Sequence, residues 1–217
     1  MTPVLEVERL SIAAGGRRVV DELSFRIAPG EALALVGESG SGKSATARAV
    51  IGLLPPGLMP DGGDIRFEGA ALAANSAALR RLRGPGIGML FQEPMTSLNP
   101  AHRIGAQMEE GLALHTRLSR TQRRDACLAM LERVGICDAE RRLNAFPHEF
   151  SGGMRQRIML ASVMLLRPRL LIADEPTTAL DTLTQAEVMG LMSGLAREHG
   201  TALLLITHDL GLVARYA

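Results

Sequence analysis

The amino-acid sequence predicts an α/β fold with a parallel-sheet core, an antiparallel β subdomain at the N-terminus and an inserted helical subdomain. Short apolar runs alternate with segments of helical periodicity, which is the pattern of a parallel sheet covered by helices. The compact apolar run Ala32–Val36 stops at a glycine, and a helical pattern follows at Lys43–Leu54; this is typical of a buried strand leading into a helix. From Ile104 to Arg167, arginine, glutamate, leucine and alanine dominate at helical spacing, so we expect the inserted subdomain there.

The remaining elements follow in chain order. Leu5–Leu10 and Leu23–Ile27 are expected to be strands on either side of a turn at Gly15 and Gly16. Ala70–Ala78 is alanine-rich and is expected to form a loop or a short helix. Further strands are expected at Asp64–Glu68, Ile87–Phe91, Leu170–Ala173 and Ala202–Thr207, and helices at Thr182–His199 and from Leu210 onward. We expect residues 1–217 to form a single domain.

The composition argues against several classes of protein. The net charge is +1 and aromatic residues make up 3%, which disfavours a basic surface or a base-stacking platform for nucleic acid. The longest apolar runs, such as Ile158–Leu166, are far shorter than the ~20 residues of a membrane span. Met1–Glu8 lacks the apolar block of a signal peptide, and Cys127 and Cys137 lack the spacing of a zinc site. The chain is therefore expected in a cytosol, where it would reach a membrane by docking onto a partner.

A glycine-rich segment after Ala32–Val36 fits the phosphate-loop pattern GxxxxGK[ST] completely. Its glycines let the backbone aim N–H groups at a polyphosphate, and the following helix adds its N-terminal dipole. Lys43 supplies a point charge to the outer phosphates, and the Ser44 hydroxyl can hold Mg²⁺. The alternative, a glycine-rich turn without a ligand, is disfavoured by the flanking strand and helix. The residues expected to bind nucleotide here are Gly37, Glu38, Ser39, Gly40, Ser41, Gly42, Lys43 and Ser44.

Two adjacent acids, Asp174 and Glu175, follow the expected strand Leu170–Ala173. Ligands of open parallel sheets bind beyond the carboxyl ends of the strands. Because adjacent residues of a strand point in different directions, the two acids are expected to do different jobs. Asp174 is expected to hold Mg²⁺, directly or through water, and Glu175 to face an attacking water as general base. Two solvated acids at the end of a core strand are the alternative, which the phosphate loop in the same chain makes weaker.

Taken in order, these segments resemble the ABC (ATP-binding cassette) ATPases, which are P-loop NTPases. Phe150–Arg157 resembles the family's signature segment, and it lies just upstream of the acidic strand as in the family. Thr178–Asp181 resembles the D-loop, which lines the seam between two nucleotide-binding domains. Gln92 matches the Q-loop glutamine and His208 the switch histidine. The ordered set covers nearly the whole chain and is more specific than any single motif.

The resemblance implies an ATPase that works with ATP and Mg²⁺ as two domains closed face to face. Each ATP would lie between one chain's phosphate loop and the other chain's Ser151, Gly152 and Gly153, where a helix N-cap and two glycines form a second anion-binding nest. The implied catalytic residues are Glu175 and His208. The implied nucleotide contacts outside the phosphate loop are Gln92, Ser151, Gly152, Gly153 and Asp181, and the implied Mg²⁺ ligands are Ser44, Gln92 and Asp174.

Residues 91–100, 147–151 and 173–181 resemble more narrowly the oligopeptide, dipeptide and nickel importer branch. This implies the ATP-hydrolysing subunit of a bacterial importer, peripheral on the cytoplasmic face of the inner membrane. Its partners would be a second nucleotide-binding domain, identical or not, transmembrane permease subunits and, indirectly, an extracytoplasmic solute-binding protein, with no nucleic acid. The loop Gln92–Pro100 and part of the helical subdomain would form the docking surface for the permease. The alternatives are an ABC ATPase of DNA repair or translation, a non-hydrolysing nucleotide-binding module, and another P-loop enzyme such as a kinase.

The sequence departs from the family pattern in two places. The family often stacks adenine on an aromatic residue in the first hairpin, whereas Ile12, Ala13 and Ala14 occupy that region here. We therefore expect weaker stacking or a different contact. Relatives continue beyond the position of Ala217 and often carry a C-terminal extension that can bind an iron–sulfur cluster. The chain is thus expected to be truncated at its C-terminal end.

Overall fold

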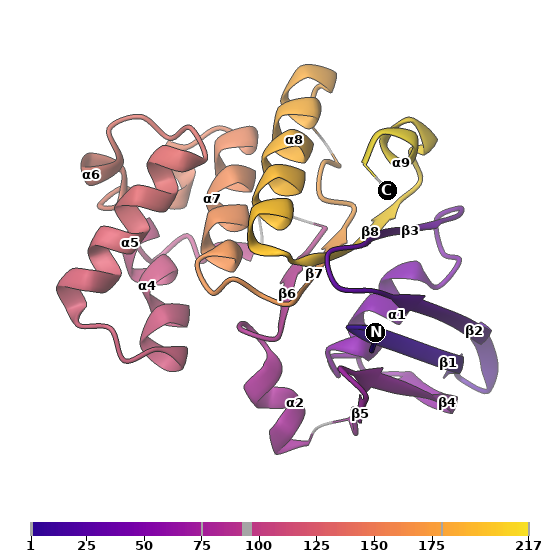
Figure 1. Ribbon diagram of the computed structural model, residues 1–217. Coiled ribbons are helices and arrows are strands. Elements are labelled where there is room, and N and C mark those ends of the chain that lie inside the picture. The colour runs from indigo at the N-terminus through magenta and orange to yellow at the C-terminus, as the bar shows by residue number, and fades with distance from the viewer. Residues whose placement is uncertain (1, 75, 93–96, 179, 217) are drawn as a thin grey trace.

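The computed structural model contains two four-stranded sheets and a separate group of helices (Figure 1). It describes residues 2–74, 76–92, 97–178 and 180–216. In one sheet the strands are antiparallel and lie in the order β2 (Arg17–Ile27), β1 (Leu5–Ala14), β4 (Leu58–Phe67) and β5 (Ala70–Ala71). In the other they are parallel and lie in the order β3 (Ala32–Val36), β8 (Ala202–Thr207), β7 (Leu170–Asp174) and β6 (Ile87–Leu90). The predicted fold class is confirmed.

The central strands of the parallel sheet are apolar on both faces because each face meets a different core. Every residue of β7 and β8 is buried. Leu170 and Ile172 pack into one core with the antiparallel sheet and α1 (Lys43–Val50). Leu171 and Ala173, which alternate with them, pack into the other core with α7 (Gly152–Met164) and α8 (Thr182–His199). Period-two alternation therefore joins two layers through one sheet, and Figure 1 shows α7 and α8 on the side of this sheet opposite α1.

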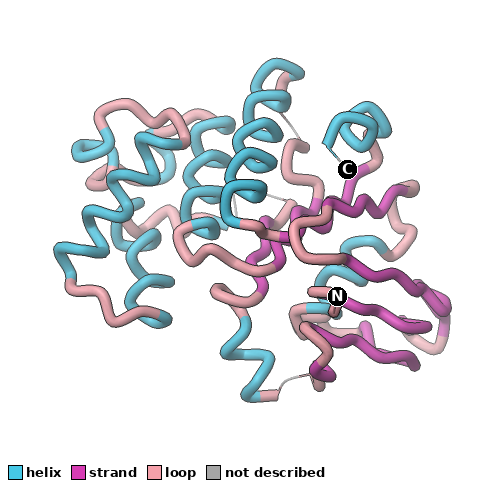
Figure 2. Tube along the Cα trace, in the orientation of Figure 1, coloured by secondary structure: helices cyan, strands magenta, loops and turns pink. Residues whose placement is uncertain are grey.

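The helical region lies beside the sheets and connects β6 to β7 (Figure 2). It contains α4 (Ile104–His115), α5 (Arg120–Arg133), α6 (Ala139–Arg142), the 3₁₀ helix η1 (Pro147–Glu149) and α7. Side chains at helical spacing, such as Ile104, Met108 and Leu112 on α4, are buried against α5 and α7. Ser119 caps α5 in a capping box with Gln122, which satisfies N–H groups that the helix itself cannot pair. Helices extend through Met164, close to the predicted end at Arg167.

Element bounds agree with the sequence where the pattern is local. The strands at 32–36 and 202–207 and the helix at 182–199 have the predicted bounds. The predicted helix 43–54 is wrong at its end, because α1 stops at Val50 and Gly52 turns the chain with a φ of 64°. The predicted strand 64–68 is only the second half of β4. The segment 70–78, expected to be a loop or a helix, instead adds the short strand β5 and then leads to α2 (Ala77–Leu82), which Ser76 caps.

The other deviations are small. The hairpin strands are longer than predicted, because pairing continues to the turn at Gly15 and Gly16, whose φ values of 55° and 83° only glycine adopts easily. The last element, α9 (Leu210–Tyr216), begins where predicted. In the described part of the chain, none of the helices combines the length and apolar composition that a bilayer crossing requires.

Candidate functional site

The phosphate loop connects β3 to α1, as the sequence predicted. Gly42 is the N-cap residue of α1 and has a φ of 87°. A Cβ atom on Gly42 would lie 2.5 Å from the Val19 carbonyl oxygen, and one on Gly37 would lie 2.9 Å from the Ser41 Oγ atom. At Gly42 both the backbone conformation and the space therefore require glycine.

Lys43, the only lysine in the sequence, folds back over this loop. Its Nζ atom donates to the carbonyl oxygens of Gly37 and Glu38, both at 2.7 Å, and lies 3.4 Å from the Ser41 Oγ atom. The ammonium group is thus held at the centre of the loop, where backbone N–H groups and the N-terminus of α1 add positive potential. This arrangement suits a polyphosphate.

Ser44 and Asp174 meet at the carboxyl ends of β3 and β7. The Ser44 Oγ atom donates to Asp174 Oδ1 at 2.8 Å. Asp174 is fully buried, and its Oδ2 atom has no hydrogen-bond partner among the described residues. Burial raises the pKa of Asp174, and the hydrogen bond from Ser44 opposes that rise. A buried carboxylate oxygen without a partner is costly, and it marks a place where a cation would be favourable.

These two side chains fit a magnesium ion. Mg²⁺ in phosphoryl-transfer sites is commonly bound by one or two carboxylates together with substrate phosphates. A hydroxyl and a carboxylate next to a phosphate loop supply that donor set. Within residues that the structure describes, no group of three or more His, Cys, Asp or Glu side chains could hold a metal. The donor set therefore points to a metal shared with a polyphosphate.

Three side chains from distant segments surround the Glu175 carboxylate. Its Oε2 atom accepts from Gln92 Nε2 at 3.1 Å and from Thr178 Oγ1 at 2.9 Å, and its Oε1 atom lies 3.3 Å from His208 Nδ1. Burial would raise the pKa of Glu175, but the hydrogen bonds from Thr178 and His208 and the Lys43 charge lower it below its usual value. Glu175 also has a φ of 45°, a left-handed conformation that a non-glycine residue adopts at a cost.

A cleft of about 300 Å³ joins the phosphate loop to Gln92 and Glu175. Val19, Pro55 and Leu58 line it beside the glycines of the loop, and none of the described residues in its lining is aromatic. Ile12 lies in the hydrophobic core and is fully buried, so it does not face the cleft. The sequence predicted that no aromatic residue of the first hairpin would stack on adenine, and the described wall of the cleft is aliphatic. The lining residues are Val19, Ser39, Gly40, Gly42, Lys43, Ser44, Ala45, Arg48, Pro55, Leu58, Gln92 and Glu175.

The signature residues do not belong to this cleft. Ser151 is the N-cap of α7, and its Oγ atom accepts from the Met154 N–H at 3.3 Å. Gly152 and Gly153 form the first turn, and a Cβ atom on Gly153 would lie 2.4 Å from Thr184 Cγ2 on α8. The structure therefore brings together the predicted residues of the phosphate loop, Gln92, Asp174, Glu175 and His208, and it leaves the Ser151 nest elsewhere on the chain.

Asp181 is likewise absent from the lining of the cleft. It caps α8: Oδ1 accepts from the Thr184 N–H at 3.0 Å and Oδ2 from Thr184 Oγ1 at 2.7 Å. These hydrogen bonds lower the pKa of Asp181. Residues 93–96 of the expected docking loop and Ala179 of the expected D-loop lie outside the described residues.

Sequence reasoning placed Thr178 in the D-loop and Gln156 in the signature segment, but it did not predict the contacts that these two side chains make at Glu175 and Pro176. The contact of Thr178 is described above. Gln156 is 1% exposed and donates through Nε2 to the Pro176 carbonyl oxygen. Gln156 links α7 to the turn that follows Glu175. A polar side chain on the buried face of α7 was the available signal, but its partner depends on tertiary structure.

Known proteins resemble this chain in sequence and in structure. Residues 20–178 match the family described as ABC transporter. The peptidoglycan transport ATP-binding protein YejF of Agrobacterium fabrum is 50% identical, over 99% of this chain and 40% of that protein. The oligopeptide transport ATP-binding protein OppD of Bacillus subtilis is 46% identical, over 100% of this chain and 62% of that protein. The dimeric post-hydrolysis structure of the ATP-binding cassette MJ0796, bound to ADP and Pi, superimposes with a TM-score of 0.81 at 26% identity, over 96% of this chain and 89% of that one.

The two curated relatives are longer proteins, of which this chain spans 40% and 62%. Within the shared length, the similarity includes both the β3–α1 phosphate loop and the acids at the end of β7. The family match alone covers most of the chain, from residue 20 to residue 178. This chain belongs to the ABC transporter family.

Proposed function

We propose that this chain binds and hydrolyses ATP and so drives an importer for peptides or nickel. The observation that carries the proposal is the hydrogen bond between Ser44 and Asp174, which joins the phosphate loop to the acidic end of β7. Residues of the phosphate loop and the candidate base Glu175 line the same cleft. The names of the relatives, peptidoglycan and oligopeptide transport ATP-binding proteins, support the transport role. Residues 1–217 would form one nucleotide-binding domain.

The nucleotide would bind with its phosphates in the loop Gly37–Gly42 and its base toward the aliphatic wall. Lys43 would move its hydrogen bonds from the Gly37 and Glu38 carbonyl oxygens to phosphate oxygens, which are stronger acceptors because they are charged. Val19 and Leu58 would pack on the base. The lost aromatic stacking costs ~1–3 kcal/mol by analogy with base-stacking sites, so the phosphates would provide most of the affinity.

Hydrolysis would depend on Glu175 and His208. Glu175 would orient a water and accept its proton as the oxygen attacks the γ-phosphorus, while the bond to the bridging oxygen breaks and ADP leaves. His208 and Lys43 would stabilise the charge that develops on the transferred phosphoryl group. Magnesium held by Ser44 and Asp174, with Gln92 nearby, would supply charge neutralisation at the phosphate oxygens. Gln92, bonded to Glu175 in this structure, is placed to respond to changes at the hydrolytic centre.

A second nucleotide-binding domain, identical or not, would complete each site. Ser151, Gly152 and Gly153 lie outside the cleft of their own chain, so their N–H groups are available to a nucleotide bound by a partner. Asp181, at the N-terminus of α8, would line the seam between the two chains. The dimeric post-hydrolysis structure of MJ0796 supports this arrangement. ATP would then join the two chains, and hydrolysis would release them.

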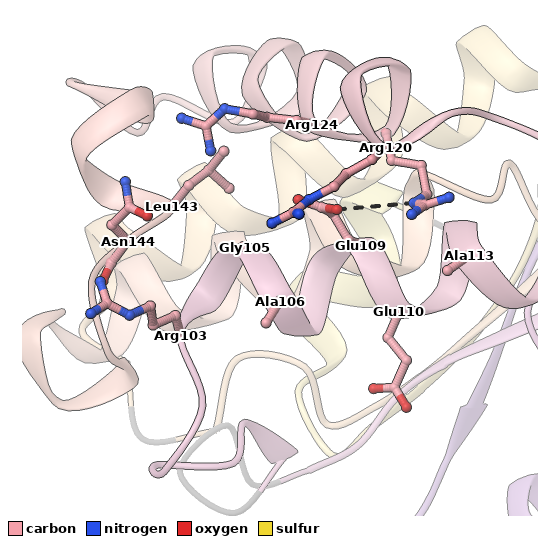
Figure 3. A pocket seen from close by; sticks show the side chains of 11 residues that line it. Arg103, Gly105, Ala106, Glu109, Glu110, Ala113, Arg120, Arg124, Leu143 and Asn144 are labelled. Atoms are coloured by element: carbon pink, nitrogen blue, oxygen red, sulfur yellow. Dashed lines mark hydrogen bonds and ion pairs between the residues drawn. The ribbon is translucent and has the colours of Figure 1, made fainter.

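The transmembrane permease subunits would dock on the helical region and the loop 92–100, holding the chain at the cytoplasmic face of a bacterial inner membrane. An extracytoplasmic solute-binding protein would take part only through the permease. A cleft of about 350 Å³ between α4 and α5 supports this surface (Figure 3). Among its described lining residues, four are arginines and two, Glu109 and Glu110, are acids. Arg123 pairs with Glu109 at 3.9 Å and Arg124 with Glu140 at 3.2 Å. A permease segment with acidic side chains would complement this charge. The arginines are Arg103, Arg120, Arg123 and Arg124.

An ABC ATPase of DNA repair or translation is the weaker candidate. The net charge of +1 and the 3% of aromatic residues provide little that would attract or stack nucleic acid. The curated relatives carry names of transport proteins. Nucleic acid is therefore not among the proposed partners.

The test is ATP turnover of the full-length protein assembled with its permease, compared with the Glu175→Gln variant. If Glu175 is the general base, turnover falls by ~10²–10⁴-fold while ATP affinity stays the same. The neutral amide also removes repulsion against the γ-phosphate, so ATP should hold the variant as a dimer. Asp64→Asn, which changes an exposed acid on β4 outside the helical region, is the control. Near-normal turnover by Glu175→Gln would contradict the proposed role.

A further inference from the structure

Of the three side chains around the Glu175 carboxylate, Thr178 belongs to the segment that resembles the D-loop, but its hydroxyl has no assigned role. We propose that Thr178 is a positioning residue, whose hydroxyl fixes the carboxylate of Glu175 so that its Oε1 atom is the one that accepts the proton from water. This inference rests on the proposed function, because it assumes that Glu175 acts as general base. Thr178 acts through Glu175 and is not itself expected to contact the nucleotide.

Thr178 is joined to Glu175 by two hydrogen bonds within one turn. Its N–H donates to the Glu175 carbonyl oxygen at 3.2 Å, and its hydroxyl donates to Glu175 Oε2 at 2.9 Å. On the other side, the Glu175 N–H donates to the Ile206 carbonyl oxygen of β8 at 2.9 Å. The backbone of Glu175 is therefore held from both sides in its left-handed conformation, and the hydroxyl of Thr178 restricts the side-chain torsions that remain free.

The two oxygens of the Glu175 carboxylate are not equivalent. Oε2 accepts two hydrogen bonds, from Thr178 and from Gln92, whereas the contact of Oε1 with His208 is longer, at 3.3 Å. The His208 side chain is also 65% exposed, which makes that contact easy to exchange. A carboxylate oxygen can accept more than one hydrogen bond. Oε1 is therefore the oxygen with capacity left for a water and its proton.

Thr178 differs from the other two donors in its distance along the chain. Gln92 and His208 reach Glu175 from 83 and 33 residues away, on different elements, whereas Thr178 lies three residues away. A contact within one turn persists when distant segments shift relative to each other. Thr178 is thus the donor that would still hold the carboxylate if Gln92 or His208 moved away.

A positioning role predicts a loss of turnover without a loss of binding. Thr178 is not among the residues that line the nucleotide cleft, so its hydroxyl can be removed without changing a phosphate contact. A general base must lie within hydrogen-bond reach of the proton that it accepts, and a small misplacement is expensive in rate. The loss should be smaller than that of Glu175→Gln, because the carboxylate is still present.

The experiment compares Thr178→Val, Thr178→Ser and Thr182→Val in the full-length protein assembled with its permease. Valine keeps the shape and removes the hydroxyl, and serine keeps the hydroxyl. Thr182 is also exposed, and its side chain has no hydrogen bond in the part of the chain described here, so it is the matched control. We expect kcat of Thr178→Val to fall by roughly 10- to 100-fold, the value of a hydrogen bond to a charged group, with KM within about 2-fold. Thr178→Ser should restore most of the turnover, and Thr182→Val should match the wild type.

A double-mutant cycle with Glu175→Gln tests whether Thr178 acts through Glu175. Combined with Glu175→Gln, Thr178→Val should lower turnover much less than it does alone, because residues that act as a unit are not additive. Any of four outcomes would overturn the proposal. They are a normal kcat in Thr178→Val, a loss of ATP affinity as large as the loss of kcat, a failure of Thr178→Ser to restore turnover, and additive effects of Thr178→Val and Glu175→Gln. If Glu175→Gln is slow and Thr178→Val is normal, only the role of Thr178 fails. If Glu175→Gln keeps its turnover, the proposed function of Glu175 fails as well.

Discussion

The phosphate loop before α1 and the Ser151 nest before α7 use the same local chemistry in different surroundings. Each places glycines at a helix N-terminus, where unpaired N–H groups attract anions. The phosphate loop is enclosed by its own chain: Lys43 lies over it, Val19 packs against Gly42, Asp174 accepts a hydrogen bond from Ser44, and Glu175 lines the same cleft. Ser151 and Gly152 are exposed. A Cβ atom on Gly152 would lie 3.7 Å from Leu180 Cδ2, and one on Gly153 would lie 2.4 Å from Thr184 Cγ2, so the neighbours of the two glycines are uncharged side chains.

This difference implies that the phosphate loop determines ATP affinity, whereas the Ser151 nest contributes to the association of two chains. A site with a lysine, a candidate magnesium-binding pair and a candidate base would bind a nucleotide and act on it. A bare helix terminus has dipole and N–H groups only, which are each worth about 1 kcal/mol or less on an exposed surface. We therefore expect changes at the phosphate loop to affect binding within one chain, and changes at Ser151 to affect contact between two chains.

The largest expected effect is that of Lys43→Ala. The ammonium group is the only lysine charge in the chain and lies over the loop, so its removal should lower ATP affinity by at least the ~100-fold value of strong charge-assisted hydrogen bonds and abolish productive binding. Nucleotide titration of the purified protein measures the affinity. Arg17→Ala, which removes an exposed charge at the start of β2, is the control. Unchanged affinity with unchanged turnover would show that the loop is not the phosphate site.

A smaller and different effect is expected from Ser151→Ala. In the Glu175→Gln background, ATP-driven dimer formation should weaken by about 10-fold, as for the loss of one hydrogen bond, while the ATP affinity of a single chain stays the same. Loss of the helix cap should also lower the free energy of unfolding by ~1 kcal/mol. Analytical ultracentrifugation with ATP and urea unfolding measure the two quantities.

Ser119→Ala is the matched control for Ser151→Ala. Ser119 caps α5 through the same kind of bond, from the Gln122 N–H at 3.2 Å, so it should show the loss of stability without any change in dimer formation. Equal dimer formation by Ser151→Ala and the wild type would remove the basis for the two-chain site.

The smallest expected effect is that the contribution of Asp181 to the free energy of unfolding decreases at acid pH. Hydrogen bonds from Thr184 lower the pKa of Asp181 in the folded chain. A lowered folded-state pKa contributes stability above the unfolded-state value, and this contribution is lost as the pH falls below about 4. The difference in free energy of unfolding between the wild type and Asp181→Ala should therefore be larger at pH 7 than at pH 3. Asp138→Asn is the control, because Asp138 makes no side-chain cap bond at α6; a pH-independent difference for Asp181 would contradict the prediction.

The sequence predicted the parts of the site that depend on neighbouring residues. The segment 37–44 contains its own turn, charge and helix start, so its geometry follows from local physics. The sequence could not show that Glu175 would accept from Gln92 and Thr178 at once, because these bonds depend on strand order and on side-chain torsions. Gln156 belongs to the same class, since its partner is a backbone carbonyl that packing alone brings within reach.

Missed elements in the fold have a similar cause. The part of β4 before Asp64 contains Pro60, Gly62 and Gly63, residues that normally interrupt a strand. Pairing with β1 overrides this, and the register shifts between Glu8 and Ser11, opposite the glycines. β5 has only two residues and exists because it pairs with Arg66 and Phe67. Tertiary pairing therefore decided both cases against local propensity.

Apart from five histidines, every other basic side chain in residues 1–217 is an arginine, so this segment has a single ε-amine. Within residues 1–217, an acylating reagent that reacts with primary amines would, apart from an α-amino group, modify only Lys43. Its reactivity would depend on whether the Gly37 and Glu38 carbonyl oxygens, or phosphate oxygens, hold the ammonium form. The loop thus carries its own chemical reporter: mass spectrometry of the acylated chain can follow nucleotide occupancy without an added label.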